Sequence, residues 1–212
     1  MTLIKSISGI RGTIGGKPGD GLTPFDVVKF TSAYGAWIIS RNKDKKCKII
    51  LGRDARISGT MVSGLVSSTL LGLGIDVIDT GLSTTPTVEM EVPFHQAQGG
   101  IILTASHNPK QWNALKLLNE KGEFISAADG AEVLDIAERE AFQYAEVGQL
   151  GTLTTDHHSI ARHIEKILAL PMVDRKAIAS KNFKVVIDCV NSTGGIAVPA
   201  LLRALGVKDI VE

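Results

Sequence analysis

The sequence predicts an α/β fold: a three-layer α/β/α domain with a mixed, largely parallel sheet, followed by a partial second α/β unit. Short apolar runs such as residues 48–51 and 75–80 predict strands. Segments with helical spacing follow them, so strand and helix alternate. From residue 147 the composition turns to Gly, Thr and Gln without an apolar period, which indicates a linker over 147–158. We therefore expect a first domain over 1–146 and a second unit over 159–212.

Local signals justify the first elements in chain order. Residues 3–8 predict a short strand. The glycines between positions 9 and 21 predict a flexible loop, because glycine tolerates positive φ. A helix is expected over 23–40, with Thr as N-cap and Pro at the first helical position. The apolar strand at 48–51 then leads to a helix over 58–73, which a Ser caps and a Gly ends.

The alternation continues to the end of the chain. The remaining expected elements are bounded by turn residues, and they are strands at 75–80 and 99–104, a helix after Thr84, a hairpin-like pair at 115–119 and 122–125, a helix at 126–145, a helix at 158–170, a strand at 184–190, a helix at 196–205 and the start of a strand at 207–211. This alternation of strands and helices favours a sheet with helices on both faces.

Composition and charge exclude several classes of partner. The chain has 212 residues, 44% of them hydrophobic, and a net charge of +1 from 23 basic and 22 acidic residues. No bulk field therefore favours nucleic acid or an anionic membrane. Cys47 and Cys189 lie in apolar runs, which favours buried, reduced thiols. The N-terminus lacks the apolar core of a signal peptide, so we expect a cytoplasmic protein.

The sequence around Ser106 is the strongest candidate for a functional site. The apolar residues 101–103 predict a strand, and Asn108-Pro109 prevents regular structure from continuing. A serine hydroxyl is thus expected at the carboxyl end of a strand, where ligands bind in open α/β sheets. A serine in such a turn is also a common turn former, so this residue alone does not distinguish the two roles.

Five motifs in order along the chain strengthen the functional interpretation. They are Ser-Gly-Ile-Arg-Gly at 8–12, Gly-Arg-Asp-Ala-Arg at 52–56, Thr-Thr-Pro at 84–86, Thr-Ala-Ser-His-Asn-Pro at 104–109 and Trp-Asn-Ala-Leu-Lys at 112–116. Together they resemble the N-terminal domain of the α-D-phosphohexomutases, the superfamily of phosphoglucomutase, phosphomannomutase and phosphoglucosamine mutase. The resemblance covers about the first 145 residues well and then extends more loosely into the start of a second domain.

The resemblance implies a phosphoryl group carried on Ser106 and moved between C1 and C6 of a hexose phosphate, through a bisphosphorylated sugar. It implies that His107, Asn108 and Arg11 orient that group and that Lys116 is the acid or base near the sugar hydroxyl. Asn108, Arg53 and Arg56 are expected to bind phosphate or substrate, although an ion-paired network of Arg53, Asp54 and Arg56 is favoured over a direct role for these two arginines.

The resemblance also implies Mg²⁺, bound here through phosphorylated Ser106 alone. Residues 191–212 supply no cluster of carboxylates for Mg²⁺. The sugar-selecting loop and the C-terminal domain of the family are likewise missing. We therefore expect a fragment of a mutase that is inactive alone and that leaves the hexose (glucose, mannose or glucosamine) open. In the last motif Ala114 stands where the family often has Gly.

Other functions remain open on the sequence alone. One alternative is a non-catalytic sugar-phosphate or protein-binding module with the same fold. A serine hydrolase is disfavoured, because no Gly-x-Ser-x-Gly elbow is present.

Three features of the second half of the chain allow more than one interpretation. His157, His158 and His163 suggest a metal site but lack supporting ligands, so exposed histidines are favoured. Residues 191–195 could receive phosphate before a helix, or simply open an α/β unit. Uncovered strands in the second unit predict either a dimer or a poorly ordered segment.

Overall fold

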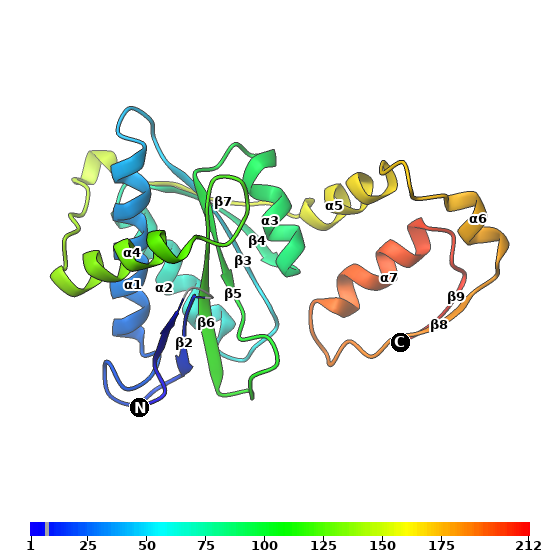
Figure 1. Ribbon diagram of the computed structural model, residues 1–212, viewed down its shortest axis with the longest axis horizontal. Helices are drawn as coiled ribbons and strands as arrows, with labels where there is room; N and C mark the ends of the chain where they lie inside the picture. Colours follow the sequence, from blue (N-terminus) through cyan, green and yellow to red (C-terminus); the bar gives the residue numbers. More distant parts are fainter. Residues whose placement is uncertain (7–8) are drawn as a thin grey trace.

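A seven-stranded sheet forms the centre of the first lobe (Figure 1). The structure is a computed structural model that describes residues 1–6 and 9–212, so Ser8 and the last residues of the strand expected over 3–8 lie outside the described residues. The strands, in chain order, are β1 (Ile4–Ser6), β2 (Gly9–Thr13), β3 (Lys48–Arg53), β4 (Asp76–Leu82), β5 (Gly99–Leu103), β6 (Trp112–Leu118) and β7 (Leu153–Thr155). Across the sheet their order is β1-β2-β6-β5-β3-β4-β7.

The sheet is mixed. β3 pairs in parallel with β5 and with β4, and β4 pairs in parallel with β7. The pairs β1–β2, β2–β6 and β6–β5 are antiparallel. The parallel strands β3 and β5 are covered on both faces, and residues 49–51 and 101–103 are buried. Both strands end on the same edge of the sheet, so the loops that follow them lie next to each other.

Helices cover both faces of the sheet and complete three layers. Helices α1 (Pro24–Arg41), α2 (Gly59–Gly72) and α4 (Ala127–Arg139) pack on one face, and α3 (Thr85–Phe94) packs on the other. The first core contains Val27, Val66 and Val133, and the second contains Val88 and Val92. The three-layer α/β/α architecture predicted from the sequence is confirmed.

The helix starts follow the capping signals in most cases. The Thr23 hydroxyl accepts from the N–H of Asp26 and the Asp26 carboxylate accepts from Thr23, which forms a capping box. Ser58 occupies the N-cap position of α2 but makes no side-chain cap bond. Its Oγ accepts instead from Nδ2 of the buried Asn113 at 2.9 Å. The cap expected at Ser58 is therefore replaced by a bond between two distant segments.

The sheet differs from the expectation in two places. Residues 9–13, expected in a glycine-rich loop, form β2, because pairing with β6 at the register Arg11–Ala114 supplies the partners that local sequence cannot reveal. Residues 153–155, expected in a linker, form the edge strand β7 beside β4. The first sheet thus extends past the boundary expected at residue 146. The expected pair of strands at 115–125 reduces to one bridge between Leu118 and Phe124.

The remaining residues form a smaller second lobe (Figure 1). It contains α5 (Ser159–Leu168), α6 (Arg175–Ser180), β8 (Lys184–Val186), α7 (Gly194–Ala204) and β9 (Asp209–Val211). β8 and β9 make a two-stranded parallel sheet. The short helix α6 was not predicted from the sequence. Within the described part of the chain, no helix has the length and apolar character needed to cross a membrane.

Candidate active site

Ser106 lies in the loop that follows β5, whose five residues are all buried. The N–H of Ser106 donates to Thr104 Oγ1 at 3.1 Å, and the N–H of Asn108 donates to Ala105 O at 3.0 Å. These bonds turn the chain sharply, and Ser106 has a φ of +53°, which residues other than glycine adopt rarely. The side chain is exposed. The Ser106 hydroxyl therefore lies exposed just beyond the carboxyl end of β5.

A cleft of about 470 Å³ separates this loop from the second lobe. The backbone N–H of Ala55 lies 3.5 Å from Ser192 Oγ on the opposite wall. The cleft is lined by residues 54–57 after β3, by residues 106–108 and Lys110 after β5, and by residues 190–192 before α7. The structure thus brings Ser106, His107, Asn108 and Arg56 to one cavity, together with a second-lobe loop whose location the sequence left open.

The Arg56 side chain is largely buried and uses all five of its N–H groups within the loops. Nε donates to the Asp54 carboxylate at 3.2 Å. The terminal nitrogens donate to backbone carbonyls, Nη1 to Pro109 O at 2.8 Å and Trp112 O at 3.0 Å, and Nη2 to Ser106 O and Asn108 O at 2.8 Å each. Arg56 was expected to bind phosphate, yet these contacts leave its guanidinium no free donor.

Arg53 is half-buried, and its Nη1 donates to the backbone oxygen of Asp54 at 3.3 Å. Among the described residues, the lining of the cleft does not include Arg53. Arg53, Asp54 and Arg56 therefore form a local network, which is one of the two roles that the sequence suggested for them. Its ion pair joins Arg56 and Asp54, whose side chains are 10% and 17% exposed.

Arg11 and Lys116 lie on the same face of the sheet. Arg11 pairs with Ala114, which stands two positions before Lys116 on β6. Paired residues and alternate residues of a strand point to the same side. The Nζ of Lys116 lies 5.6 Å from the centre of the Phe124 ring. Within the described residues, the Nε of Arg11 is buried without a hydrogen-bond partner, and neither cation lines the cleft. Both side chains would have to reach Ser106 along this face.

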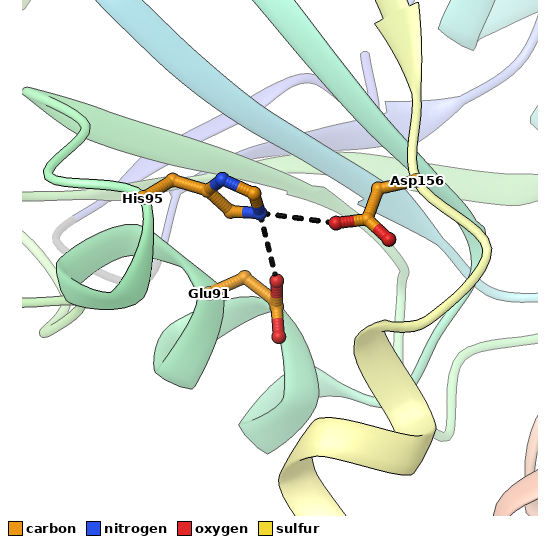
Figure 2. Close-up of side chains that lie close together, drawn as sticks. All are labelled: Glu91, His95 and Asp156. Carbon is orange, nitrogen blue, oxygen red and sulfur yellow. Dashed lines mark hydrogen bonds and ion pairs between the residues drawn. The ribbon is translucent and has the colours of Figure 1, made fainter.

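Glu91, His95 and Asp156 form a cluster that the sequence did not reveal (Figure 2). His95 Nε2 lies 3.1 Å from Glu91 Oε2 and 3.0 Å from Asp156 Oδ2. One ligand atom from each residue lies within 4.8 Å of the others, so the three could hold a metal ion. Because ionised carboxylates only accept hydrogen bonds, however, the geometry assigns a proton to His95 Nε2.

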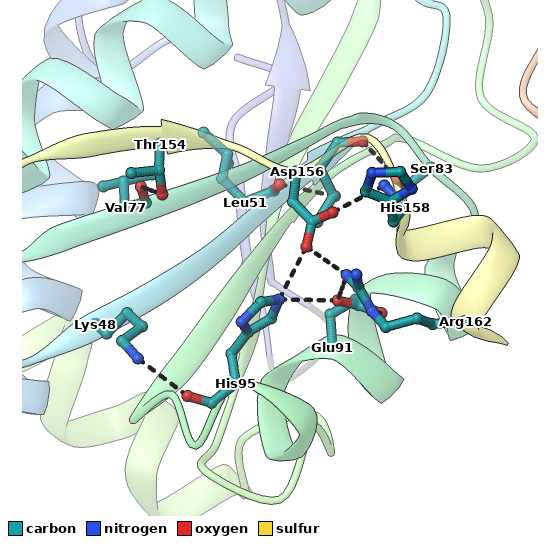
Figure 3. A network of polar contacts seen from close by, with 11 residues as sticks. Lys48, Leu51, Val77, Ser83, Glu91, His95, Thr154, Asp156, His158 and Arg162 are labelled. Carbon is teal, nitrogen blue, oxygen red and sulfur yellow. Dashed lines mark hydrogen bonds and ion pairs between the residues drawn. The ribbon is translucent and has the colours of Figure 1, made fainter. Parts of the chain in front are cut away.

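Arg162 of α5 occupies the remaining space between the two carboxylates (Figure 3). Its Nε donates to Glu91 Oε1 at 3.1 Å, and its Nη2 contacts both Glu91 and Asp156. Burial acts to raise the pKa of Asp156, but hydrogen bonds from Arg162, from the N–H of His158 and from His95 lower it to about 2. The cluster is therefore an ion-paired network, with a guanidinium where a metal ion would have to bind.

The histidines weighed as metal ligands are dispersed. His157 and His158 are exposed, whereas His163 is half-buried with Nδ1 3.0 Å from Thr87 Oγ1. Burial lowers the pKa of His163. These histidines therefore do not gather around one ion. Side chains of α5 contact α3 instead, as His163 does with Thr87 and Arg162 with Glu91.

The fold and the loop that carries Ser106 together define the class of protein to compare, a three-layer α/β/α domain with an exposed serine after a buried strand. The chain belongs to the phosphoglucomutase/phosphomannomutase family, because the sequence model of its alpha/beta/alpha domain I matches residues 3–144. This confirms the resemblance inferred from the five motifs. The matched segment contains the Ser106 loop and the arginines around it.

Two curated relatives match almost the whole chain. It is 34% identical over 201 residues to a phosphoglucosamine/phosphogalactosamine mutase of Sulfurisphaera tokodaii, and 35% identical over 201 residues to a phosphoglucomutase/phosphomannomutase of Thermococcus kodakarensis. Each alignment covers 94% of this chain. The chain spans 42% of the length of the first relative and 43% of the second.

Solved structures show the same fold. The chain superposes over its whole length on a putative phosphomannomutase from Thermus thermophilus, with a TM-score of 0.81 and 22% identity, covering 45% of that chain. A phosphoglucomutase/phosphomannomutase family protein from Burkholderia thailandensis gives a TM-score of 0.74 at 22% identity, with 44% of that chain covered. Both lobes therefore have counterparts in this family.

Proposed function

We propose that this chain is the phosphoserine-bearing part of a phosphohexomutase. In the proposed reaction, phosphorylated Ser106 transfers its phosphoryl group to the free hydroxyl of a hexose phosphate. The P–Oγ bond breaks and a new P–O bond forms on the sugar, which yields a bisphosphorylated hexose. Ser106 then takes back the phosphoryl group from the other position. The observation that carries the proposal is the exposed Ser106 hydroxyl on the wall of a cleft, in a loop held by an arginine.

The other residues take roles that phosphoryl transfer requires, namely positioning and neutralisation of charge. His107 and Asn108 flank Ser106 at the cleft and are proposed to donate to the phosphoryl oxygens. Arg11 contributes positive charge from β2, and Lys116 on β6 exchanges the proton of the sugar hydroxyl. The two cations lie on one face of the sheet, so they can act on the same group.

The Mg²⁺ that membership of this family implies would be bound through the oxygens of phosphorylated Ser106. Of the described residues that line the cleft, Asp54 has the one carboxylate, and it is bound by Arg56 at 3.2 Å. Mg²⁺ prefers several oxygen ligands in octahedral geometry, which these residues do not provide. The residues that line the cleft therefore do not form a magnesium site by themselves.

The proposal predicts a phosphate on Ser106. After incubation with glucose 1,6-bisphosphate or mannose 1,6-bisphosphate, intact mass should show one added phosphoryl group. Peptide mapping should locate it at Ser106, and Ser106→Ala should not acquire it. Ser68→Ala, which removes an exposed hydroxyl from α2, is the matched control and should be phosphorylated like the wild type.

Phosphate on a different serine would contradict the assignment of Ser106. Sugar-phosphate binding without any transfer would favour the alternative, a non-catalytic module with the mutase fold. We also propose that the chain alone is inactive as a mutase, because the described part of its cleft forms no metal site for repeated transfer. Sustained exchange of phosphate between C1 and C6 by the pure chain would contradict that part of the proposal.

We further propose that the second lobe pairs with another copy of the chain. The parallel sheet of β8 and β9 has two strands, too few for independent stability, and Phe183 and Val186 are 51% and 73% exposed. Light scattering should detect a dimer that Val186→Lys dissociates. Val147→Lys, at an 86% exposed site outside this lobe, should leave the dimer intact. A monomer whose residues 184–211 resist protease as well as the first lobe would contradict the pairing.

A further inference from the structure

Arg56 connects two loops that are about fifty residues apart in the sequence. We propose that Arg56 is a positioning residue, which holds residues 106–112 in the shape that allows Ser106 to accept a phosphoryl group. This inference rests on the proposed function of Ser106. It assigns Arg56 a role that differs from direct contact with phosphate.

The hydrogen bonds of Arg56 support this role. Its two terminal nitrogens donate to four carbonyl oxygens between Ser106 and Trp112. Three of these carbonyls belong to the loop between β5 and β6, and the fourth belongs to Trp112, the first residue of β6. A planar guanidinium has the geometry to reach several of them at once, whereas an ammonium group does not. One side chain therefore organises the loop.

The anchor of Arg56 is fixed in turn by the edge of the sheet. The backbone N–H of Asp54 donates to Leu103 O at 3.0 Å, which joins the end of β3 to the end of β5. The Asp54 carboxylate accepts from the Arg56 side chain at 3.2 Å and from the Arg56 backbone at 3.0 Å. The Arg56 guanidinium is thus held by Asp54, whose own backbone is hydrogen-bonded to the end of β5. The position of Ser106 follows from this chain of contacts.

The backbone of Ser106 explains why such support is needed. Its φ of +53° lies in the left-handed region, which a serine adopts only when its surroundings require it. The bond from Arg56 Nη2 to Ser106 O, at 2.8 Å, acts on the peptide group that follows this strained residue. Without it the loop could relax to a commoner conformation, and the hydroxyl would move relative to the cleft.

Arg56→Lys tests the inference, because it keeps the positive charge and removes the fork of donors. The maximal rate of phosphoryl transfer from glucose 1,6-bisphosphate to Ser106 should fall about 100-fold, the effect of a displacement of roughly 1 Å at a reacting group. The donor concentration that gives half the maximal rate should change little. Amide hydrogen exchange should become faster at residues 106–112. Arg139→Lys, on the exposed surface of α4, is the matched control and should match the wild type.

Each outcome decides between distinct conclusions. If the wild type takes up no phosphoryl group, the proposed function fails. If the wild type reacts and Arg56→Lys reacts equally fast, the inference about Arg56 is overturned. A raised half-saturation concentration with an unchanged maximal rate would instead make Arg56 a phosphate ligand. Should Arg56→Lys not fold, Asp54→Asn replaces it, and its maximal rate should fall by about 10-fold because the anchor weakens. An unchanged rate in Asp54→Asn would then overturn the inference.

Discussion

Replacing Arg162 with methionine is expected to lower the free energy of unfolding by about 3 kcal/mol, the lower end of the range for removing one partner of a buried ion pair. The Glu91 carboxylate is 2% exposed, and it would lose the guanidinium that lies against it. The Arg162 side chain is 20% exposed, so water could replace part of the interaction. Methionine keeps an apolar stem beside Phe94, over whose ring the guanidinium now lies at 4.5 Å. Chemical denaturation monitored by circular dichroism measures the change.

Two further variants separate the buried charge from other effects. Glu91→Gln combined with Arg162→Met should be less destabilised than Arg162→Met alone, because no buried carboxylate then remains at position 91 without its guanidinium. Arg203→Met removes an exposed ion pair with Glu212 and should cost no more than about 1 kcal/mol. A loss of the same size in Arg203→Met and Arg162→Met would show that burial of Glu91 does not determine the effect.

The dependence of this network on pH follows from Asp156. Its pKa is lowered to about 2 in the folded chain, so its contribution is present above its unfolded pKa of about 3.9. The contribution is lost as the pH falls through the folded pKa, in the window from about pH 4 to about pH 2. The contribution of Asp156 to the difference between wild type and Arg162→Met should therefore be complete above about pH 4 and shrink as the pH falls below it.

The parts of the fold that local signals encode could be predicted from the sequence. The Thr and Pro at the start of α1 and the apolar run of β3 place those elements to within a few residues. β2 could not be predicted, because Gly9 and Gly12 dominate its local pattern, and its partners lie in β6. β7 is three residues long and depends on β4 for its hydrogen bonds. Such strands exist through pairing between distant segments.

The same distinction applies to the candidate site. The location of Ser106 at the end of a strand follows from residues that are adjacent in the sequence. The contacts of Arg56 with the Ser106 loop require the ends of β3 and β5 to be neighbours, which depends on the order of the strands. The pairing of Glu91 with Arg162 joins residues 71 positions apart. The local motif therefore identifies Ser106 as the candidate reactive residue, whereas the order of the strands determines which distant residues contact its loop.

Arg11→Met is expected to slow phosphoryl transfer to Ser106 by about 100-fold or more, the usual cost of removing one donor that stabilises developing charge. Stability should change little or rise, because the Nε of Arg11 is buried without a partner among the described residues and methionine removes that unmet donor. Lys116→Met should also slow transfer while the chain stays folded, since its Nζ lies over the Phe124 ring and methionine keeps an apolar side chain there. Quenched-flow mass spectrometry gives the rates.

The combined variant tests whether the two cations serve one phosphoryl group. Arg11 and Lys116 lie on the same face of paired strands, so their effects should be coupled. In the double variant the loss of rate should then be smaller than the product of the two separate losses. Lys208→Met, at an exposed position of the second lobe, is the matched control for the loss of one positive charge. Rates in both single variants equal to that of Lys208→Met would remove Arg11 and Lys116 from the site, whereas fully multiplicative losses would show that they act independently.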